Sequence, residues 1–124
     1  MMSACVPIVP SADLEKSLRF WGEGLGFQSD TEMRDGERLI FCMLRRENLC
    51  FMLNQRAGDA ASPKNDEGIR LYWTPSNLHE AHAHLKRLGY GVSEIERRDY
   101  GQTEFFLTDD DGHSHCFGVA TQTV

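Results

Sequence analysis

Two stretches of the chain place apolar residues at helical spacing, one in each half. The stripe consists of Leu14, Leu18, Trp21 and Leu25 in the first half, and of Leu78, Ala81, Leu85 and Leu88 in the second. Asp13 precedes the first stripe, and Ser76 or Asn77 precedes the second. Such side chains accept hydrogen bonds from the free N–H groups of a first helical turn. Gly26 and Gly89 follow the stripes and suit the left-handed residue that ends a helix. The pattern predicts two helices.

Shorter apolar runs around these helices predict strands. One run precedes each helix, "CVPIV" in the first half and "IRLYW" in the second. Further runs follow the helices: "RLIFCML" and "LCFML" after the first, then "GVSEIERR", "TEFFLTD" and "SHCFGVA" after the second. The segments "RREN" and "DDDGH" are typical of hairpin turns, the latter through its Asp-Gly pair.

The chain contains an internal repeat, because "LGF" at residues 25–27 returns as "LGY" at residues 88–90. Each half then follows the order strand, helix, strand, strand, strand. We expect an α+β fold of paired βαβββ modules, with module 1 over about residues 4–55 and module 2 over about residues 69–120. A polar linker covers about residues 56–68. Neither half could bury its sheet alone, so we expect one domain over residues 1–124.

Composition narrows the function. The chain has 124 residues and a formal net charge of −6, which argues against a nucleic-acid partner, since phosphate binding needs clustered Lys and Arg. No apolar run has the length of a membrane span or the form of a signal peptide, so we expect no membrane partner and a cytoplasmic protein. The four cysteines lack CxxC spacing and have apolar neighbours, which indicates buried, reduced thiols: Cys5, Cys42, Cys50 and Cys116.

The histidine-rich segment "LHEAHAHL" at residues 78–85 comes close to a zinc signature. The H-E-x-x-H helix of zinc proteases needs two imidazoles at i and i+4, but Ala83 stands four residues after His79. The spacing fixes no third ligand among His82, His84 and the rest. We interpret the three histidines as a solvated polar helix face that could hold nickel or zinc adventitiously.

The two ends of the repeat carry a family resemblance. Val6–Phe27 resembles the opening, and Tyr100–Gly118 the close, of proteins of the vicinal oxygen chelate superfamily, which includes glyoxalases, bleomycin-resistance proteins and dioxygenases. Asp110 replaces the proline of the usual D-P-D-G turn. The resemblance implies βαβββ modules whose curved mixed sheets surround a cleft, and it implies a homodimer.

The enzymes of this superfamily mostly hold a divalent metal through His and Glu at four positions. The resemblance carries these positions onto Val6, Met52, Arg70 and Cys116. Such residues do not form a hard-metal site. A one-residue slip would bring in His115, but Ile69 and Phe51 would still offer no ligand. We therefore expect no metal and no cofactor, and we interpret His113 and His115 as partly exposed polar residues.

These features favour a metal-free protein that binds and sequesters a drug or natural product, like a bleomycin-resistance protein. The expected ligand is an aromatic natural product or antibiotic, and no catalytic residue is assigned. The alternative is an enzyme. It would be a metal-dependent glyoxalase-type lyase, epimerase or dioxygenase, or an acid–base catalyst using Glu104, His115 or Cys116. Arg70 could grip a carboxylate or phosphate, or pair with Glu104. The predicted ligand-binding residues are Phe41, Met52, Asn54, Arg70, Tyr72, Tyr100, Glu104, Ser114 and Cys116.

Overall fold

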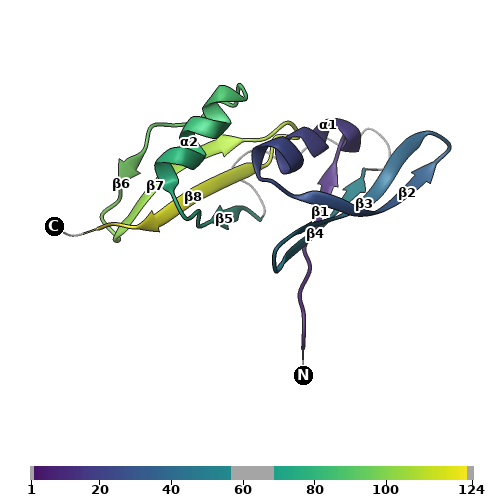
Figure 1. Cartoon of the computed structure of the whole chain (residues 1–124), viewed down its shortest axis with the longest axis horizontal. Coiled ribbons are helices and arrows are strands. Elements are labelled where there is room, and N and C mark those ends of the chain that lie inside the picture. Colours follow the sequence, from purple (N-terminus) through teal and green to yellow (C-terminus); the bar gives the residue numbers. More distant parts are fainter. Residues whose placement is uncertain (1, 57–68, 123–124) are drawn as a thin grey trace. The chain divides into compact units, whose positions relative to one another are not determined.

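The first half of the chain folds as the repeat predicts. A computed structural model of the protein describes residues 2–56 and 69–122. Its first half contains β1 (Ile8–Ser11), α1 (Leu14–Arg19), the π-helix η1 (Phe20–Gly24), β2 (Gln28–Asp35), β3 (Arg38–Arg46) and β4 (Leu49–Gln55). The strands form one four-stranded sheet in the order β1-β4-β3-β2 (Figure 1). β1 runs parallel to β4, and the other pairs are antiparallel.

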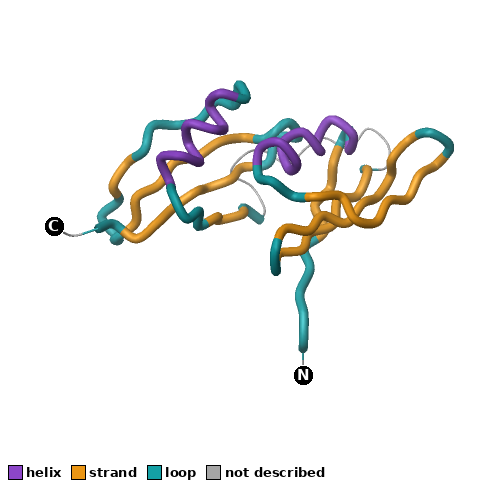
Figure 2. The backbone as a smooth tube through the Cα atoms, viewed as in Figure 1, coloured by secondary structure: helices purple, strands orange, loops and turns teal. Residues whose placement is uncertain are grey.

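The second half repeats this topology. It contains β5 (Leu71–Trp73), α2 (Leu78–Arg87), β6 (Glu96–Arg97), β7 (Gln102–Thr108) and β8 (Ser114–Ala120). The sheet order is β5-β8-β7-β6, again with a parallel first pair. Figure 2 distinguishes the strands of both halves from their helices and loops by colour. The prediction of two mixed sheets from paired βαβββ modules is therefore confirmed. The chain divides into two compact units, residues 1–62 (unit 1) and 63–124 (unit 2). Most of the predicted linker, residues 57–68, lies outside the described residues.

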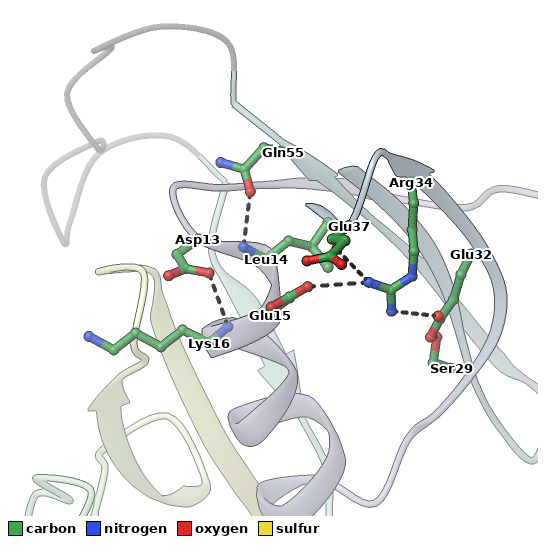
Figure 3. Close-up of polar contacts among 9 residues, drawn as sticks. All are labelled: Asp13, Leu14, Glu15, Lys16, Ser29, Glu32, Arg34, Glu37 and Gln55. Atoms are coloured by element: carbon green, nitrogen blue, oxygen red, sulfur yellow. Dashed lines mark hydrogen bonds and ion pairs between the residues drawn. The ribbon is translucent and has the colours of Figure 1, made fainter. Parts of the chain in front are cut away.

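The predicted caps hold both helices. Asp13 Oδ1 accepts from the backbone N–H of Lys16 at 3.3 Å, and Asn77, rather than Ser76, accepts from the N–H of Glu80 at 3.0 Å. Gln55 Oε1 in β4 accepts from the N–H of Leu14 at 3.0 Å and so ties the start of α1 to the sheet (Figure 3). Gly26 and Gly89 end the helices with φ of 80° and 94°.

The first helix departs from the prediction in its second half. Residues Phe20–Gly24 form a π-helical turn, in which the N–H of Leu25 reaches the carbonyl of Phe20 at 3.0 Å. Phe20 and Trp21 are both fully buried, although a regular α-helix would set neighbouring residues 100° apart. The wider turn brings both rings into the core, and Trp21 then packs against Phe27 and Phe51.

Two strands differ from the predicted ones because they bury little. All eight residues of β2 are exposed, so the strand has no apolar alternation by which the sequence could locate it. Arg34 of β2 instead bonds to Glu15 of α1 and to Glu32 (Figure 3). Charged side chains of this kind protect an edge strand from pairing with another chain. The strand predicted in "GVSEIERR" shortens to β6, two residues at the other edge.

Each sheet packs one face against its helix. In unit 1 this core face carries the buried residues Cys42, Leu44, Phe51 and Leu53. In unit 2 it carries Phe105, Leu107, His115 and Phe117, and α2 adds Leu78 and Leu85. The four cysteines are free thiols, of which Cys42 is buried, Cys50 and Cys116 are half-buried and Cys5 is exposed. The expectation of burial is therefore confirmed for Cys42 and wrong for Cys5. No helix among the described residues is long and apolar enough to cross a membrane.

Candidate functional site

The opposite face of the sheet in unit 1 is mainly apolar. Strand alternation places Ile8, Phe41, Met43, Met52 and Asn54 there, and we call these residues the unit 1 open face. Met52 pairs with Ile8 on one side and Met43 on the other, and Asn54 pairs with Phe41. The three predicted site residues of this half therefore share one face. Ile8 is 62% exposed, and Phe41, Met43 and Met52 are half-buried.

The corresponding face in unit 2 combines polar with apolar side chains around a carboxylate. We define the unit 2 open face by residues of β5, β7 and β8 that alternate away from α2: Tyr72, Glu104, Phe106, Ser114, Cys116 and Gly118. Cys116 pairs with Tyr72 and with Phe106, and Glu104 pairs with Gly118. Arg70 lies exposed just before β5, close enough for its charge to act on Cys116. The predicted residues of this half thus come to one surface.

Glu104 is the centre of this surface. Its side chain is only 2% exposed, although it lies on the face that α2 does not cover. Tyr100 donates to Glu104 Oε1 at 2.6 Å, and Tyr72 donates to Oε2 at 2.7 Å. Both tyrosines remain well exposed, at 63% and 51%. Their hydroxyls therefore cover the carboxylate while their rings face outward.

Arg98 completes the cluster, and the sequence analysis missed it. Its Nε lies 3.6 Å from Glu104 Oε1, its Nη1 lies 3.1 Å from Glu96, and its guanidinium stands 5.4 Å from the ring centre of Phe106. No local pattern points to it, because Arg98 follows β6 and comes near Glu104 only through the register that pairs Glu96 with Glu104. The partner of Glu104 is accordingly Arg98, and not Arg70, which had been weighed as its partner.

Gly118 was also missed, and it explains how Tyr72 reaches Glu104. A Cβ atom at this position would lie 1.9 Å from the Tyr72 hydroxyl and 3.0 Å from Glu104 Cγ. Any larger residue would therefore displace the Tyr72 ring. Because Gly118 has no side chain, Tyr72 of β5 can cross β8 and donate a hydrogen bond to Glu104 of β7.

The protonation states of the cluster follow from its contacts. Burial disfavours the charge of Glu104, but the hydrogen bonds from Tyr100 and Tyr72 and the charge of Arg98 outweigh it and lower its pKa. Burial and the bond to Glu104 raise the pKa of Tyr72, and the bond to Glu104 chiefly raises the pKa of Tyr100. At neutral pH the cluster is a carboxylate held by two neutral phenols.

The positions that bind metal in the enzymes of the superfamily do not suit a divalent metal here. Val6 offers no ligand atom, Met52 only a thioether, and Arg70 a positive charge. Burial and the charge of Glu104 raise the pKa of Cys116 to about 11, which keeps it a neutral thiol. Among residues 2–56 and 69–122 no three His, Cys, Asp or Glu side chains are grouped as metal ligands would be.

The histidines are not all solvated, which corrects two expectations. His82 Nε2 lies 2.8 Å from the carbonyl of Ser93, and its ring meets Phe105 edge-on at 4.9 Å, so it packs between α2 and the sheet. Of the three histidines of that segment, His79 is exposed, whereas His82 and His84 are half-buried. His115 was expected to be partly exposed but is 99% buried, on the core face rather than the open face. The residues next to His82 and His115 in the sequence do not indicate that these histidines are packed against other elements.

His115 belongs to a buried chain of hydrogen bonds. Trp73 Nε1 donates to His115 Nδ1 at 3.0 Å, and His115 Nε2 lies 2.8 Å from Asp109 Oδ2. Asp109 Oδ1 accepts from the N–H groups of Asp111 and His113, both at 2.9 Å. Because Nδ1 accepts, the imidazole carries its hydrogen on Nε2 and donates it to the carboxylate. This series of hydrogen bonds connects β5 to the β7–β8 turn on the side of the sheet opposite the open face.

Comparison with known proteins gives the superfamily to which the chain belongs. The Glyoxalase/Bleomycin resistance protein/Dioxygenase superfamily matches residues 5–117, and the chain belongs to that superfamily. No curated protein sequence matches the chain significantly.

Solved structures with the same fold cover nearly the whole chain. A glyoxalase family protein from Enterococcus faecalis is 20% identical, with a TM-score of 0.78, over 95% of this chain and 97% of its own. TnmS3, an antibiotic binding protein from Streptomyces sp. CB03234, is 18% identical, with a TM-score of 0.73, over 98% and 99%. The fosfomycin resistance protein FosX from Listeria monocytogenes is 14% identical, with a TM-score of 0.78, over 98% and 95%. At these identities the likeness establishes the fold alone.

Proposed function

We propose that this chain is a small-molecule-binding protein that sequesters an aromatic drug or natural product without a metal and without transforming it. The observation that carries the proposal is the state of Glu104. Its two oxygens are occupied by the hydroxyls of Tyr72 and Tyr100, and its lowered pKa leaves it no proton to give and little basicity. The cluster is thus better suited to present two ring faces than to move protons.

The exposed rings are the binding element of this proposal. Tyr72 and Tyr100 are each more than half exposed, and their hydroxyls are held by one buried carboxylate. The Tyr72 ring, which lies across Gly118 and is held by this carboxylate, loses little conformational entropy when an aromatic ligand stacks on it. Phe106 and Cys116 extend the same face with apolar atoms, as is usual in small-molecule sites.

The unit 1 open face supports the same function with different atoms. Phe41, Met43 and Met52 are half-buried and stand together through their pairing with neighbouring strands. Thioether side chains adapt to irregular apolar shapes. An antibiotic-binding protein, TnmS3, and a fosfomycin resistance protein share the fold, which is consistent with a drug or natural product as ligand.

We also propose a cytoplasmic homodimer. The exposed apolar side chains of unit 1, such as Ile8 and Met33, would be covered in such an assembly. Light scattering coupled to gel filtration measures the mass directly, and a mass near 14.1 kDa at micromolar concentration would contradict the dimer.

The test of the function combines metal content, binding and chemical outcome. Untagged protein, purified without chelators, is analysed for bound metal, because residues 79–84 could imitate a histidine tag. It is then titrated by calorimetry with a panel of glycopeptide and polycyclic aromatic antibiotics, and each ligand is recovered for mass spectrometry. We expect far less than one metal per chain, binding of at least one compound, and its recovery unchanged. About one tightly held metal per chain with a modified compound would instead establish the lyase, epimerase or dioxygenase alternative.

A further inference from the structure

Two donors converge on a single oxygen of Glu104. Tyr100 holds Oε1 at 2.6 Å, while Arg98 Nε stands 3.6 Å from the same atom, beyond hydrogen-bond distance. Within the described residues this Nε is buried and has no hydrogen-bond partner. A buried N–H without an acceptor is costly to a folded protein. Glu104 Oε1 is an acceptor that could relieve it, but Arg98 has to move closer to reach this oxygen, on which Tyr100 now donates.

Tyr100 is the more easily released of the two tyrosines. It lies 63% exposed in a tight turn, where Gly101 adopts a φ of 87° and its N–H bonds to the carbonyl of Arg98 at 3.3 Å. Tyr72, in contrast, lies across Gly118 within strand β5 and holds the other oxygen, Oε2. A rotation of the Tyr100 side chain therefore disturbs no strand and leaves Glu104 with one phenol.

We propose that Tyr100 binds the ligand through its hydroxyl and that Arg98 is the positioning residue that makes this possible. When Tyr100 turns away, Arg98 Nε moves onto Glu104 Oε1, so the carboxylate stays paired and the buried N–H gains its acceptor. Tyr100 keeps its hydrogen and needs an acceptor for it. The ligand class that fits is an aromatic compound with an acceptor oxygen beside the ring, such as a carbonyl, a carboxylate or a phenolate.

This inference rests on the proposed function, but its first test needs no ligand. In Tyr100→Phe the hydroxyl is gone, so Arg98 should close on Glu104 in the free protein. We expect the Arg98 Nε–H resonance in ¹⁵N NMR to move downfield and its exchange with water to slow severalfold. Tyr72→Phe is the matched control, since Tyr72 bonds to the other oxygen, and it should leave that resonance nearly unchanged. No change in Tyr100→Phe, or an equal change in both variants, would overturn the exchange.

The second test addresses the ligand class with two probes of similar shape. 2-Naphthoate carries an acceptor, whereas protonated 2-naphthylmethylamine carries only donors. We expect Tyr100→Phe to weaken 2-naphthoate binding about tenfold, the value of one hydrogen bond to a charged group, and to leave amine binding unaffected. Arg98→Met should weaken 2-naphthoate to a similar degree, and the double variant should add little to either. Equal losses for both probes, or additive losses, would contradict the roles assigned to Tyr100 and Arg98. Failure of both probes to bind would count against the proposed function, while the Arg98 resonance would still decide the exchange.

Discussion

The two units share one topology and present different chemistry at equivalent positions. Ile8 pairs with Met52 as Tyr72 pairs with Cys116, and Phe41 pairs with Asn54 as Glu104 pairs with Gly118. Unit 1 thus has aliphatic, thioether and phenyl groups where unit 2 has a phenol, a thiol and a carboxylate. The backbone pairing alone does not dictate what the open face does.

The core faces differ in the same sense. The ring of Phe51 in unit 1 packs against those of Trp21 and Phe27, with ring centres 5.2 Å and 5.6 Å apart. The equivalent residue of unit 2, His115, forms hydrogen bonds with Trp73 and Asp109. Apolar packing is indifferent to pH and tolerant of small changes in shape, while a buried polar chain depends on every member having its partner. Unit 2 is therefore the more sensitive of the two to the loss of a single side chain.

Acidification should separate the two units most strongly. The pKa of Asp109 is lowered, since the hydrogen bonds from His115 and from the N–H of His113 outweigh its burial, and the pKa of Glu104 is also lowered. Their contributions to stability are complete above the ordinary values of 3.8 and 4.5 and are lost as pH falls through the lower folded values. Hydrogen exchange measured from pH 6 downward should show β7 and β8 losing protection before β3 and β4. Simultaneous loss in both sheets would break the comparison.

Asp109→Asn should have the largest effect among single substitutions. The amide oxygen of the new Asn can still accept from the backbone N–H groups of Asp111 and His113. The amide NH₂ group then points at the Nε2–H of His115, so that two donors face each other. The ring cannot change tautomer, because Trp73 already donates to Nδ1. We expect a loss of about 3 kcal/mol in the free energy of unfolding, measured with urea.

Asp110→Asn is the control for that experiment. Its oxygen can still accept from the Tyr90 hydroxyl, which lies 2.7 Å away, so the loss should stay below about 1 kcal/mol. Equal losses in the two variants would show that the buried chain through His115 is not what distinguishes unit 2.

Gly118→Ala should rank next. The new Cβ would meet the Tyr72 hydroxyl at 1.9 Å, so the ring must leave Glu104 or the strands must part. We expect a loss of about 2 kcal/mol, typical of overpacking, together with a change in tyrosine fluorescence. Asn54→Ala at the equivalent exposed position should cost less than about 0.5 kcal/mol. A neutral Gly118→Ala would contradict the role of the glycine.

The two tyrosine substitutions should have the smallest effects, with Tyr72→Phe the larger of the two. It removes one hydrogen bond to a buried carboxylate and should cost about 1 kcal/mol in thermal or urea unfolding. Tyr100→Phe should cost less than Tyr72→Phe, because Arg98 can take the vacated oxygen. The reverse order would indicate that Arg98 does not replace the phenol.

Much of this fold was predictable because its signals are local. The helices follow from their apolar stripes, from the caps Asp13 and Asn77 and from the two glycines that end them. Strand alternation places the site residues on the open faces: Met52, Asn54, Tyr72, Glu104 and Cys116. β2 was not located because all its residues are exposed, and the π-helical turn contains two adjacent buried rings, Phe20 and Trp21, that the apolar stripe does not distinguish from a regular helix.

The cluster itself was not predictable from local pattern. The cluster joins Tyr72 to Glu104 across strand β8, and this is possible only because Gly118 has no Cβ atom. His115 likewise reads as an ordinary polar residue until Trp73 and Asp109 are brought beside it. Such contacts depend on strand order and register, which no single segment of the sequence contains.

The most direct test of the account is a ¹⁵N NMR titration of untagged, EDTA-treated protein with 2-naphthoate. If the face around Glu104 is a metal-free binding surface, resonances of β5, β7 and β8 should shift saturably, with those of Tyr72, Tyr100 and Arg98 among the largest, and the naphthoate should be recovered unchanged. Binding that appears only after manganese, nickel or zinc is added, or shifts that leave these three strands untouched, would contradict the account.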